Sequence, residues 1–476
     1  MLYIDGEWRS AATGRTFASF DPATGEGIAH VADGGVDDVR DAIEAAAVAF
    51  ERWSTRTAYE RASYLYAAHQ LMVERREALA QLMTREQGKP IRMARNEVGY
   101  AADFLLWFAE EAKRNYGETI PSARGGQRFL VLHQPIGVVG AITPWNYPIS
   151  MLTRKIAPAL AAGCTVVVKP AEQTPLCAVE TFKVFDDLGI DPGVVNLVTT
   201  SDPETVGCEL VEHRKVRKIA FTGSTEVGKL VAAKAAQTVK RVSLELGGHA
   251  PFIVLDDADP VRAAKGAAAV KFLNTGQACI CPNRLFVHRG LAEPFVATLR
   301  QRFEGLVAGA GTTDGVTVGP LIDEAALDKM ERQVADAMDK GARVLTGGRR
   351  LVEDGLDRGC FYAPTLIVDV TSDMAIYREE TFGPIAPVIV FDDDDEVIEM
   401  ANDTEYGLAS YVYTNDLSRA FRVFERLNFG MVGINDINPT SAAAPFGGIK
   451  ESGIGVEGAH QGLAEYLDTK LVGIAL

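Results

Sequence analysis

The stretch PIGVVGAITPWNYPISMLTRKIAPALAAGCTVVVKP, residues 135–170, decides the fold. Two apolar runs rich in β-branched residues, at 137–142 and 165–168, flank a helical segment at 149–162. A strand, a helix and a second strand in this order are typical of a parallel sheet. Because the apolar runs are continuous and do not alternate with polar residues, we expect strands that are covered on both faces.

The same alternation continues on the C-terminal side of this stretch. Further candidate strands lie at 194–198, 218–221 and 242–245, with a helix at 177–187, and a second series lies at 252–255, 285–287, 366–368, 387–391 and 410–413. On the N-terminal side, residues 1–30 suggest a short hairpin, and helical spacing predicts helices within 36–89 and over 97–115. One of these helices runs through Tyr66, Leu71 and Leu79. The fold class we predict is α/β, with two α/β domains in tandem.

Composition limits the classes of function. The chain has 476 residues and a formal net charge of -16, which argues against a nonspecific binder of nucleic acid or of anionic membranes. Its six cysteines are too sparse for a disulfide scaffold and lack zinc spacing, so we predict no metal site. The opening residues MLYIDGEWRS do not have the pattern of a signal peptide, and no apolar run is long enough to span a bilayer. We therefore expect a cytoplasmic protein.

One nucleotide-binding motif fails on inspection. Residues 223–229, GSTEVGK, match the glycine and lysine positions of a P-loop, but Leu230 stands where Ser or Thr is required. The preceding residues, FTGST at 221–225, still predict a strand end that opens into a helix N-terminus able to receive a phosphate. The chain contains no clean G-x-G-x-x-G, so the residues alone support a nucleotide site only in part.

Four short segments, each called an island here, contain residues that could take part in catalysis. Cys279 follows Gly-Gln in a polar loop before a strand, which suits either a thiolate nucleophile or an inert cysteine. Asn146 places an amide on a turn that suits an oxyanion donor. Glu245 is a carboxylate in an apolar setting, where burial favours a base with a raised pKa. The fourth island is EETFGP at 379–384, and each island by itself is also compatible with ordinary turns.

Read together, the motifs resemble the aldehyde dehydrogenase superfamily. They are TPWN at 143–146, KPAEQTP at 169–175, FTGST at 221–225, LELGG at 244–248, GQAC at 276–279, EETFGP at 379–384 and PFGG at 445–448. The resemblance covers nearly the whole chain. It implies a Rossmann-like cofactor domain over 1–116 and 136–247, a catalytic domain over 248–450, and a small β oligomerisation element over 117–135 and 451–476. It also implies a homodimer or homotetramer.

The resemblance assigns a catalytic role to three residues. Cys279 would attack the aldehyde carbon, and Asn146 with the backbone N–H of Cys279 would hold the oxyanion. Glu245 would be the base for the water that hydrolyses the thioester, and its presence favours the hydrolytic class over relatives that acylate coenzyme A. A non-catalytic family member is the distant alternative, which the intact Asn146, Glu245 and Cys279 disfavour.

The resemblance also implies an NAD cofactor, with NADP possible. Lys169 and Glu172 would hold the adenosine ribose, and the Glu172 carboxylate would repel a 2′-phosphate and so favour NAD. Gly223 and Ser224 would meet the pyrophosphate. The remaining residues that we expect near the cofactor are Thr143, Pro144, Trp145, Leu246, Glu380 and Phe382, the last two at the nicotinamide ribose.

For the substrate, the resemblance is strongest to the succinate-semialdehyde dehydrogenase branch. An Arg eight residues past the TPWN asparagine, here Arg154, binds the distal carboxylate in that branch; a paired structural arginine is the alternative. The branch's second Arg is here replaced by Leu273, leaving Thr440 or Ser441 to offer neutral hydrogen bonds. We expect succinate semialdehyde or a similar substrate, with lactaldehyde, glycolaldehyde or a broad range as alternatives. Cys281 suggests a reversible disulfide with Cys279, or simply a second, non-reactive cysteine.

Overall fold

The computed structural model describes all residues, 1–476, and begins with two hairpins and four helices. Where the sequence suggested one hairpin, strands β1 (Leu2–Ile4) and β2 (Glu7–Arg9) form the first and β3 (Thr16–Phe20) and β4 (Gly27–Ala32) the second. The helices are α1 (Val36–Trp53), α2 (Ala58–Glu74), α3 (Arg76–Gln87) and α4 (Ile91–Ala112). The single helix expected through Tyr66, Leu71 and Leu79 is wrong, because the chain breaks at Arg75, which caps α2 and begins α3.

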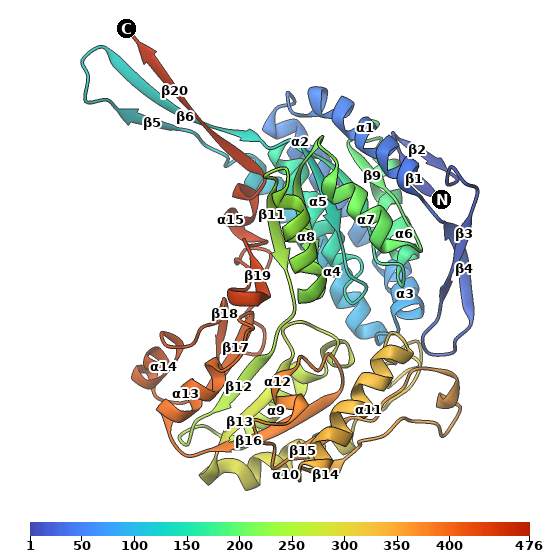
Figure 1. The fold of residues 1–476 in the computed structure, drawn as a ribbon, viewed down its shortest axis with the longest axis vertical. Coiled ribbons are helices and arrows are strands. Elements are labelled where there is room, and N and C mark those ends of the chain that lie inside the picture. Colours follow the sequence, from blue (N-terminus) through green and yellow to red (C-terminus); the bar gives the residue numbers. More distant parts are fainter.

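The first large sheet grows from the stretch 135–170. Its strand order is β19-β11-β10-β7-β8-β9-β1-β2, and β7 to β11 are parallel. These strands are β7 (Val138–Ile142), β8 (Thr165–Lys169), β9 (Val195–Leu197), β10 (Val216–Thr222), β11 (Arg241–Glu245) and the short antiparallel β19 (Gly453–Ile454). The connecting helices are α5 (Ser150–Ala162), α6 (Pro175–Asp187), α7 (Pro203–Glu212) and α8 (Thr225–Ala236). The predicted strand–helix alternation is confirmed (Figure 1).

The second large sheet has the order β14-β15-β16-β13-β12-β17-β18. Its strands are β12 (Ala250–Val254), β13 (Pro282–His288), β14 (Arg343–Thr346), β15 (Thr365–Val368), β16 (Ile385–Phe391), β17 (Ala409–Tyr413) and β18 (Met431–Ile434). Its helices are α9 (Pro260–Lys271), α10 (Ala292–Glu304), α11 (Glu324–Asp339), α12 (Ala375–Arg378), α13 (Asp394–Asn402) and α14 (Leu417–Phe424). The edge strands β14 and β18 were not predicted, because both are short and partly exposed.

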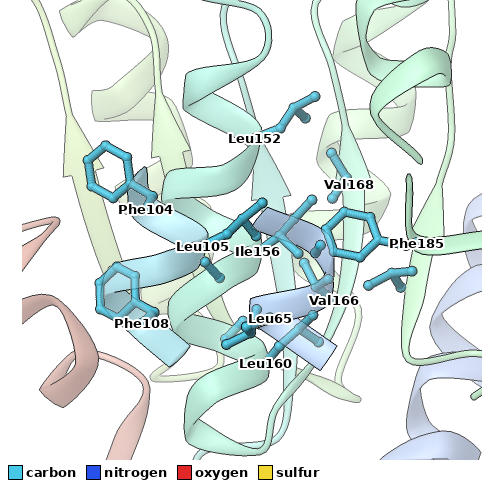
Figure 2. Close-up of a cluster of buried hydrophobic side chains, with 14 of the residues drawn as sticks. Leu65, Phe104, Leu105, Phe108, Leu152, Ile156, Leu160, Val166, Val168 and Phe185 are labelled. Atoms are coloured by element: carbon cyan, nitrogen blue, oxygen red, sulfur yellow. The ribbon is translucent and has the colours of Figure 1, made fainter. Parts of the chain in front are cut away.

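Helix α5 lies in the centre of the largest hydrophobic cluster. All of its residues are buried, and its Ile156 and Leu160 pack among Phe104 and Phe108 of α4 and Leu65 of α2 (Figure 2). Each fully buried side chain of this size contributes about 1.5–3 kcal/mol to folding. A helix buried on every side must find partners for any charged residue it carries.

No helix in the structure is both long and apolar enough to cross a bilayer.

A three-stranded sheet projects away from the two α/β layers (Figure 1). Strand β20 (Leu467–Ala475) pairs antiparallel with β6 (Gln127–Pro135), which in turn pairs with β5 (Glu118–Pro121). Before this arm the chain adds α15 (Ala459–Ala464), which packs on α4 and α5. Both outer strands of the arm have a free edge, and edges of this kind accept strands from other chains.

Candidate active site

Three of the predicted residues meet where the two large sheets face one another. Asn146 follows β7, Glu245 ends β11, and Cys279 lies between a 3₁₀ turn (Leu273–Gly276) and β13. The Asn146 side-chain amide donates a hydrogen bond to the carbonyl of Gln277, two residues before Cys279, at 3.0 Å. A Cβ on Gly248 would lie 2.3 Å from the carbonyl oxygen of Cys279, so the loop after Glu245 touches the loop of the cysteine.

Cys279 lies in the wall of a cavity of about 510 Å³. Burial and the nearby Glu245 carboxylate raise the pKa of its thiol. Its backbone N–H donates to no other group of the protein. An asparagine amide has two N–H donors, so Asn146, which uses one on Gln277, retains another. Cys279 and Asn146 therefore each retain an N–H donor without a partner, and N–H donors of this kind stabilise an oxyanion.

Glu245 is a carboxylate without a hydrogen-bond partner. Its side chain is buried, and neither of its oxygens accepts a hydrogen bond from the protein. Burial raises the pKa of this carboxyl well above its ordinary value and the charge of Glu457 raises it further, while Arg154 and Lys155 act in the opposite direction. A carboxyl with a raised pKa and free oxygens can accept a proton near neutral pH.

Both charged residues of α5 share one partner. Arg154 Nε lies 2.9 Å from Glu457 Oε2, and the guanidinium stacks 4.1 Å from the Phe446 ring centre. Lys155 pairs with the same carboxylate and donates to Thr222 Oγ1 at 2.7 Å. Arg154 is therefore in an ion pair with Glu457, which is the alternative to substrate binding that the sequence left open. Arg154 nevertheless lines the cavity of Cys279, and its Nη2 is buried without a partner.

Some of the residues predicted to bind the substrate line the cavity, and others do not. Leu273 lies in its wall. Thr440 also lines it, whereas Ser441 is exposed, lies outside the lining and accepts a hydrogen bond from the N–H of Ala443. Other lining residues are Lys89, Met93, Tyr100, Tyr147, Met151 and Phe446. The wall thus combines apolar and aromatic side chains with charged ones, among them Arg154.

Predicted cofactor residues gather at the carboxyl ends of the first sheet. Lys169 ends β8, and its Nζ lies 3.6 Å from the Glu172 carboxylate. Burial lowers the pKa of Lys169. Gly223 and Ser224 precede α8, with Ser224 capping the helix by accepting a hydrogen bond from the N–H of Val227.

The other expected cofactor residues lie between this edge and Cys279. Glu380 accepts a hydrogen bond from the N–H of Gly248 at 2.9 Å, and burial raises the pKa of its carboxyl. Phe382 has a positive φ of 54°, and its ring meets Trp145, which follows Pro144, edge to face. The remaining two, Thr143 and Leu246, are buried.

These residues fit a dinucleotide. Thr143 Oγ1 is a buried hydroxyl that has no partner within the protein. The first turn of α8 presents N–H groups that can receive a phosphate. On the same helix, Val227 and Leu230 are 45% and 58% exposed, which leaves an apolar surface for a base.

Cys281 lies in the core of the second domain. Its side chain is 1% exposed, and its thiol donates to the Val270 carbonyl at 3.2 Å. Cys279 and Cys281 are both free thiols. The disulfide hypothesis stays a prediction, and it would require Cys281 to leave this position.

Sequence reasoning missed four polar residues that hold the site together: Lys89, Glu97, Asn274 and Glu457. Glu457 lies 302 positions from Lys155 along the chain. No local pattern marks it, because a carboxylate in a Gly-rich loop is ordinarily solvated. Lys89 and Glu97 lie near the start of α4, where charged residues in a sequence are ordinarily interpreted as exposed to solvent.

The fold and the site define an α/β protein in which the loop of a partly buried cysteine, Cys279, contacts residues at the carboxyl ends of a parallel sheet. The chain matches the aldehyde dehydrogenase family over residues 8–472 and belongs to that family. The predicted family, the α/β fold class and the prediction of an NAD(P)-dependent aldehyde dehydrogenase are thereby confirmed.

Similar proteins include dehydrogenases that are named for aldehydes with an acid group. A 3-sulfolactaldehyde dehydrogenase of Pseudomonas putida is 49% identical over 99% of this chain and 96% of its own length. A succinate-semialdehyde dehydrogenase (NADP(+)) of Escherichia coli K12 is 50% identical over 99% of this chain and 97% of its own. Among solved structures, a succinate-semialdehyde dehydrogenase from Burkholderia pseudomallei is 47% identical, with a TM-score of 0.98, covering 100% of this chain and 98% of that one.

Proposed function

We propose that this enzyme oxidises a short aldehyde bearing a distal acid group to the carboxylic acid, with Cys279 as nucleophile. The observation that carries the proposal is Arg154, which lines the cavity of Cys279 with a buried, unpartnered Nη2. A buried guanidinium nitrogen without a partner costs free energy, and an acid oxygen of the substrate would supply that partner.

The chain's own groups account for the bond changes. The Cys279 thiol loses its proton to water and its Sγ bonds to the aldehyde carbon, so that the aldehyde oxygen becomes an oxyanion held by the Cys279 N–H and the free N–H of Asn146. Bound NAD(P)+ supplies the acceptor for the hydride that leaves this carbon, and a thioester remains on Cys279. Glu245 then takes a proton from the water that attacks the thioester, the acid leaves, and the thiol is restored. The free oxygens of Glu245 support hydrolysis in place of transfer to coenzyme A.

For the cofactor, we infer a preference for NAD over NADP. The Glu172 side chain is about one-third exposed beside Lys169, at the edge where a ribose would bind. A carboxylate there accepts hydrogen bonds from ribose hydroxyls and repels a 2′-phosphate. Thr143, Gly223, Ser224, Glu380 and Phe382 complete the proposed contacts, together with Pro144, Trp145 and Leu246.

For the substrate, we infer succinate semialdehyde or an aldehyde similar in length and charge. Arg154 supplies a guanidinium, and Leu273 stands where the succinate-semialdehyde dehydrogenase branch has a second Arg. The acid end of the substrate would therefore be bound by the Arg154 guanidinium and by neutral groups such as Thr440. The similar P. putida enzyme is named for a sulfonated aldehyde, which supports acid groups other than carboxylate. Lactaldehyde, glycolaldehyde and a broad range of aldehydes are the alternatives.

We also infer a homodimer or homotetramer built through the β5–β6–β20 arm. Several large apolar side chains of the arm are exposed, namely Ile120, Leu132, Leu471, Ile474 and the C-terminal Leu476. An apolar strand with a free edge exposed to water is unfavourable, and strand addition from a second chain would cover it.

Two measurements test the proposal. The first is NAD(P)H formation with succinate semialdehyde, glutarate semialdehyde, lactaldehyde and benzaldehyde, with either cofactor. The second is a rapid-mixing experiment on Glu245→Gln, which should release one NAD(P)H per site and then stall at the thioester. Absence of turnover on every aldehyde would reject the enzyme assignment, and undiminished steady turnover of Glu245→Gln would reject its role as base.

A further inference from the structure

The turn between α3 and α4, residues 88–90 (GKP), places its lysine in the protein interior. Lys89 is 1% exposed, and its Nζ donates a hydrogen bond to the backbone carbonyl of Asn146 at 2.7 Å. Its charge is balanced by Glu97, whose side chain is equally buried. A buried lysine is tolerated only when paired, and this pair lies in the wall of the Cys279 cavity.

Glu97 connects this pair to the start of helix α5. Its Oε1 accepts hydrogen bonds from the N–H groups of Ile149 and Ser150, at 3.0 and 3.1 Å. Helix N-termini have unsatisfied N–H groups and favour a carboxylate. One ion pair therefore holds both the backbone of Asn146 and the helix that follows it.

Asn146 is held from the other side by the loop of the cysteine. Asn274 Nδ2 donates to the same Asn146 carbonyl at 2.9 Å, and Asn146 Nδ2 donates to the Gln277 carbonyl at 3.0 Å. With Lys89 these contacts determine the orientation of the Asn146 backbone and amide. They leave one amide N–H for an oxyanion on the substrate carbon.

The backbone of the turn that carries Lys89 is held in place by close packing against residues 319–320. Gly88 has φ +90°, and a Cβ there would lie 2.5 Å from Pro320 Cγ. A Cβ on Gly319 would lie 2.2 Å from the Gly88 carbonyl. Gln277 Nε2 donates to the Pro320 carbonyl at 3.2 Å. The segment 319–320 thus supports both Lys89 and the residue that holds the Asn146 amide.

Lys89 has no donor left for a substrate. An ammonium has three N–H donors. Glu97 and the Asn146 carbonyl take two, and the third side of the ammonium faces the Tyr147 ring, whose centre is 4.0 Å away. Lys89 is therefore suited to positioning a neighbour and not to binding the acid end of an aldehyde.

We propose that the Lys89–Glu97 ion pair is a positioning device for Asn146, and that it sets the rate of thioester formation and not the affinity for aldehyde. The inference rests on the proposed role of Asn146 as oxyanion donor. Lys89 touches neither substrate nor cofactor in this scheme, and its effect passes through the Asn146 backbone.

The test uses the full-length variants Lys89→Met and Lys89→Met/Glu97→Gln. We expect kcat to fall by about 10- to 100-fold in both, with KM for aldehyde changed by less than about 3-fold. The double variant has no unpaired buried charge, so it should recover the thermal stability lost in the single variant without recovering kcat. Alkylation of Cys279 by iodoacetamide passes through no oxyanion, so its rate and pH profile should equal those of the wild type.

Lys218→Met is the matched control. Lys218 is also fully buried in the first domain, but it bonds to Ser243 and has no contact with Asn146. It should retain kcat within about 3-fold. A double variant with wild-type kcat would overturn the proposal, as would a rise in KM confined to acid-bearing aldehydes or a parallel loss of alkylation and turnover. Failure of the proposed function is distinct, because the wild-type enzyme itself would then not oxidise aldehydes.

Discussion

The carbonyl oxygen of Cys279 occupies the space next to Gly248 in which a side chain would begin, 2.3 Å from an ideal Cβ. The loop that follows Glu245 and the loop that carries Cys279 can approach only because residue 248 is glycine. Glu245 and Cys279, the proposed base and nucleophile, are carried by different sheets, and this contact brings their two loops together.

Replacing Gly248 with Ala should displace the Cys279 loop. Overpacking of this kind costs about 1–3 kcal/mol of folding free energy, and a shift of the nucleophile by ~1 Å can cost about 100-fold in rate. We expect kcat to fall by at least about 10-fold with a lower Tm. Gly207→Ala is the control, since a Cβ in that helix meets nothing within 4 Å. Equal kcat for Gly248→Ala and the wild type would contradict the prediction.

Glu457→Gln should move the pH dependence of turnover. The charge of Glu457 raises the pKa of Glu245, and Arg154 and Lys155, which lower it, would lose their partner. Both changes lower the pKa of Glu245, so the base becomes ionised at lower pH. The acidic limb of the kcat–pH profile should therefore shift to lower pH.

The control for this shift is Glu465→Gln, a partly exposed carboxylate 3.5 Å from buried Lys218. Loss of one partner of a buried pair costs about 3–5 kcal/mol, so thermal unfolding is measured first and kinetics are recorded below the transition. An acidic limb that stays in place or moves to higher pH would show that Glu457 does not act on the base.

Leu273→Arg should sharpen selection for acid-bearing aldehydes. The new guanidinium would enter the wall of the Cys279 cavity, where Arg154 has a buried Nη2 without a partner. A hydrogen bond to a charged group contributes about 1.5–3 kcal/mol, so KM for succinate semialdehyde should fall by roughly 10-fold. Leu273→Met, which conserves volume, should leave the ratio of KM values for succinate semialdehyde and propionaldehyde unchanged. Equal changes for the two aldehydes in Leu273→Arg would speak against an acid subsite here.

Glu172→Ser should raise the relative use of NADP. Removing the carboxylate removes its repulsion of a 2′-phosphate, and we expect the kcat/KM ratio of NADP to NAD to increase by roughly 10-fold. Glu180→Ser alters a carboxylate on α6, the helix that follows the turn of Glu172, where Glu180 pairs with Lys183 at the surface. That control should keep the wild-type ratio. A ratio that is the same in Glu172→Ser and the wild type would place the ribose elsewhere.

Leu471→Lys should weaken assembly. Leu471 is 63% exposed on β20, and a charge there opposes burial against a second chain. Sedimentation velocity should show a dimer or tetramer for the wild type and a smaller species for Leu471→Lys at the same concentration. Leu417→Lys changes an equally exposed leucine on α14 and should assemble normally. A monomeric wild type would exclude the arm as an interface.

Local patterns were enough to predict the alternation of strands and helices, whereas the roles of the site residues came from the resemblance of several motifs read together. The apolar runs at 137–142 and 165–168 became β7 and β8 because continuous burial on both faces is visible in the residue types themselves. Asn146 follows β7, Glu245 ends β11 and Cys279 precedes β13, so all three lie at or near strand ends that are visible in the sequence. Boundaries were less predictable, since α2 and α3 divide at Arg75 with no Gly or Pro to mark the break.

Only the tertiary structure decided how charge is distributed inside the enzyme. Arg154 and Lys155 could be surface residues of a helix until α5 is seen to be buried on every side, with Glu457 supplied from 302 residues away. Lys89 reaches the Asn146 carbonyl across 57 residues. The sequence by itself determined which groups the enzyme possesses and which strands carry them. Their pairing, pKa and orientation depend on burial and on long-range contact, which no local pattern encodes.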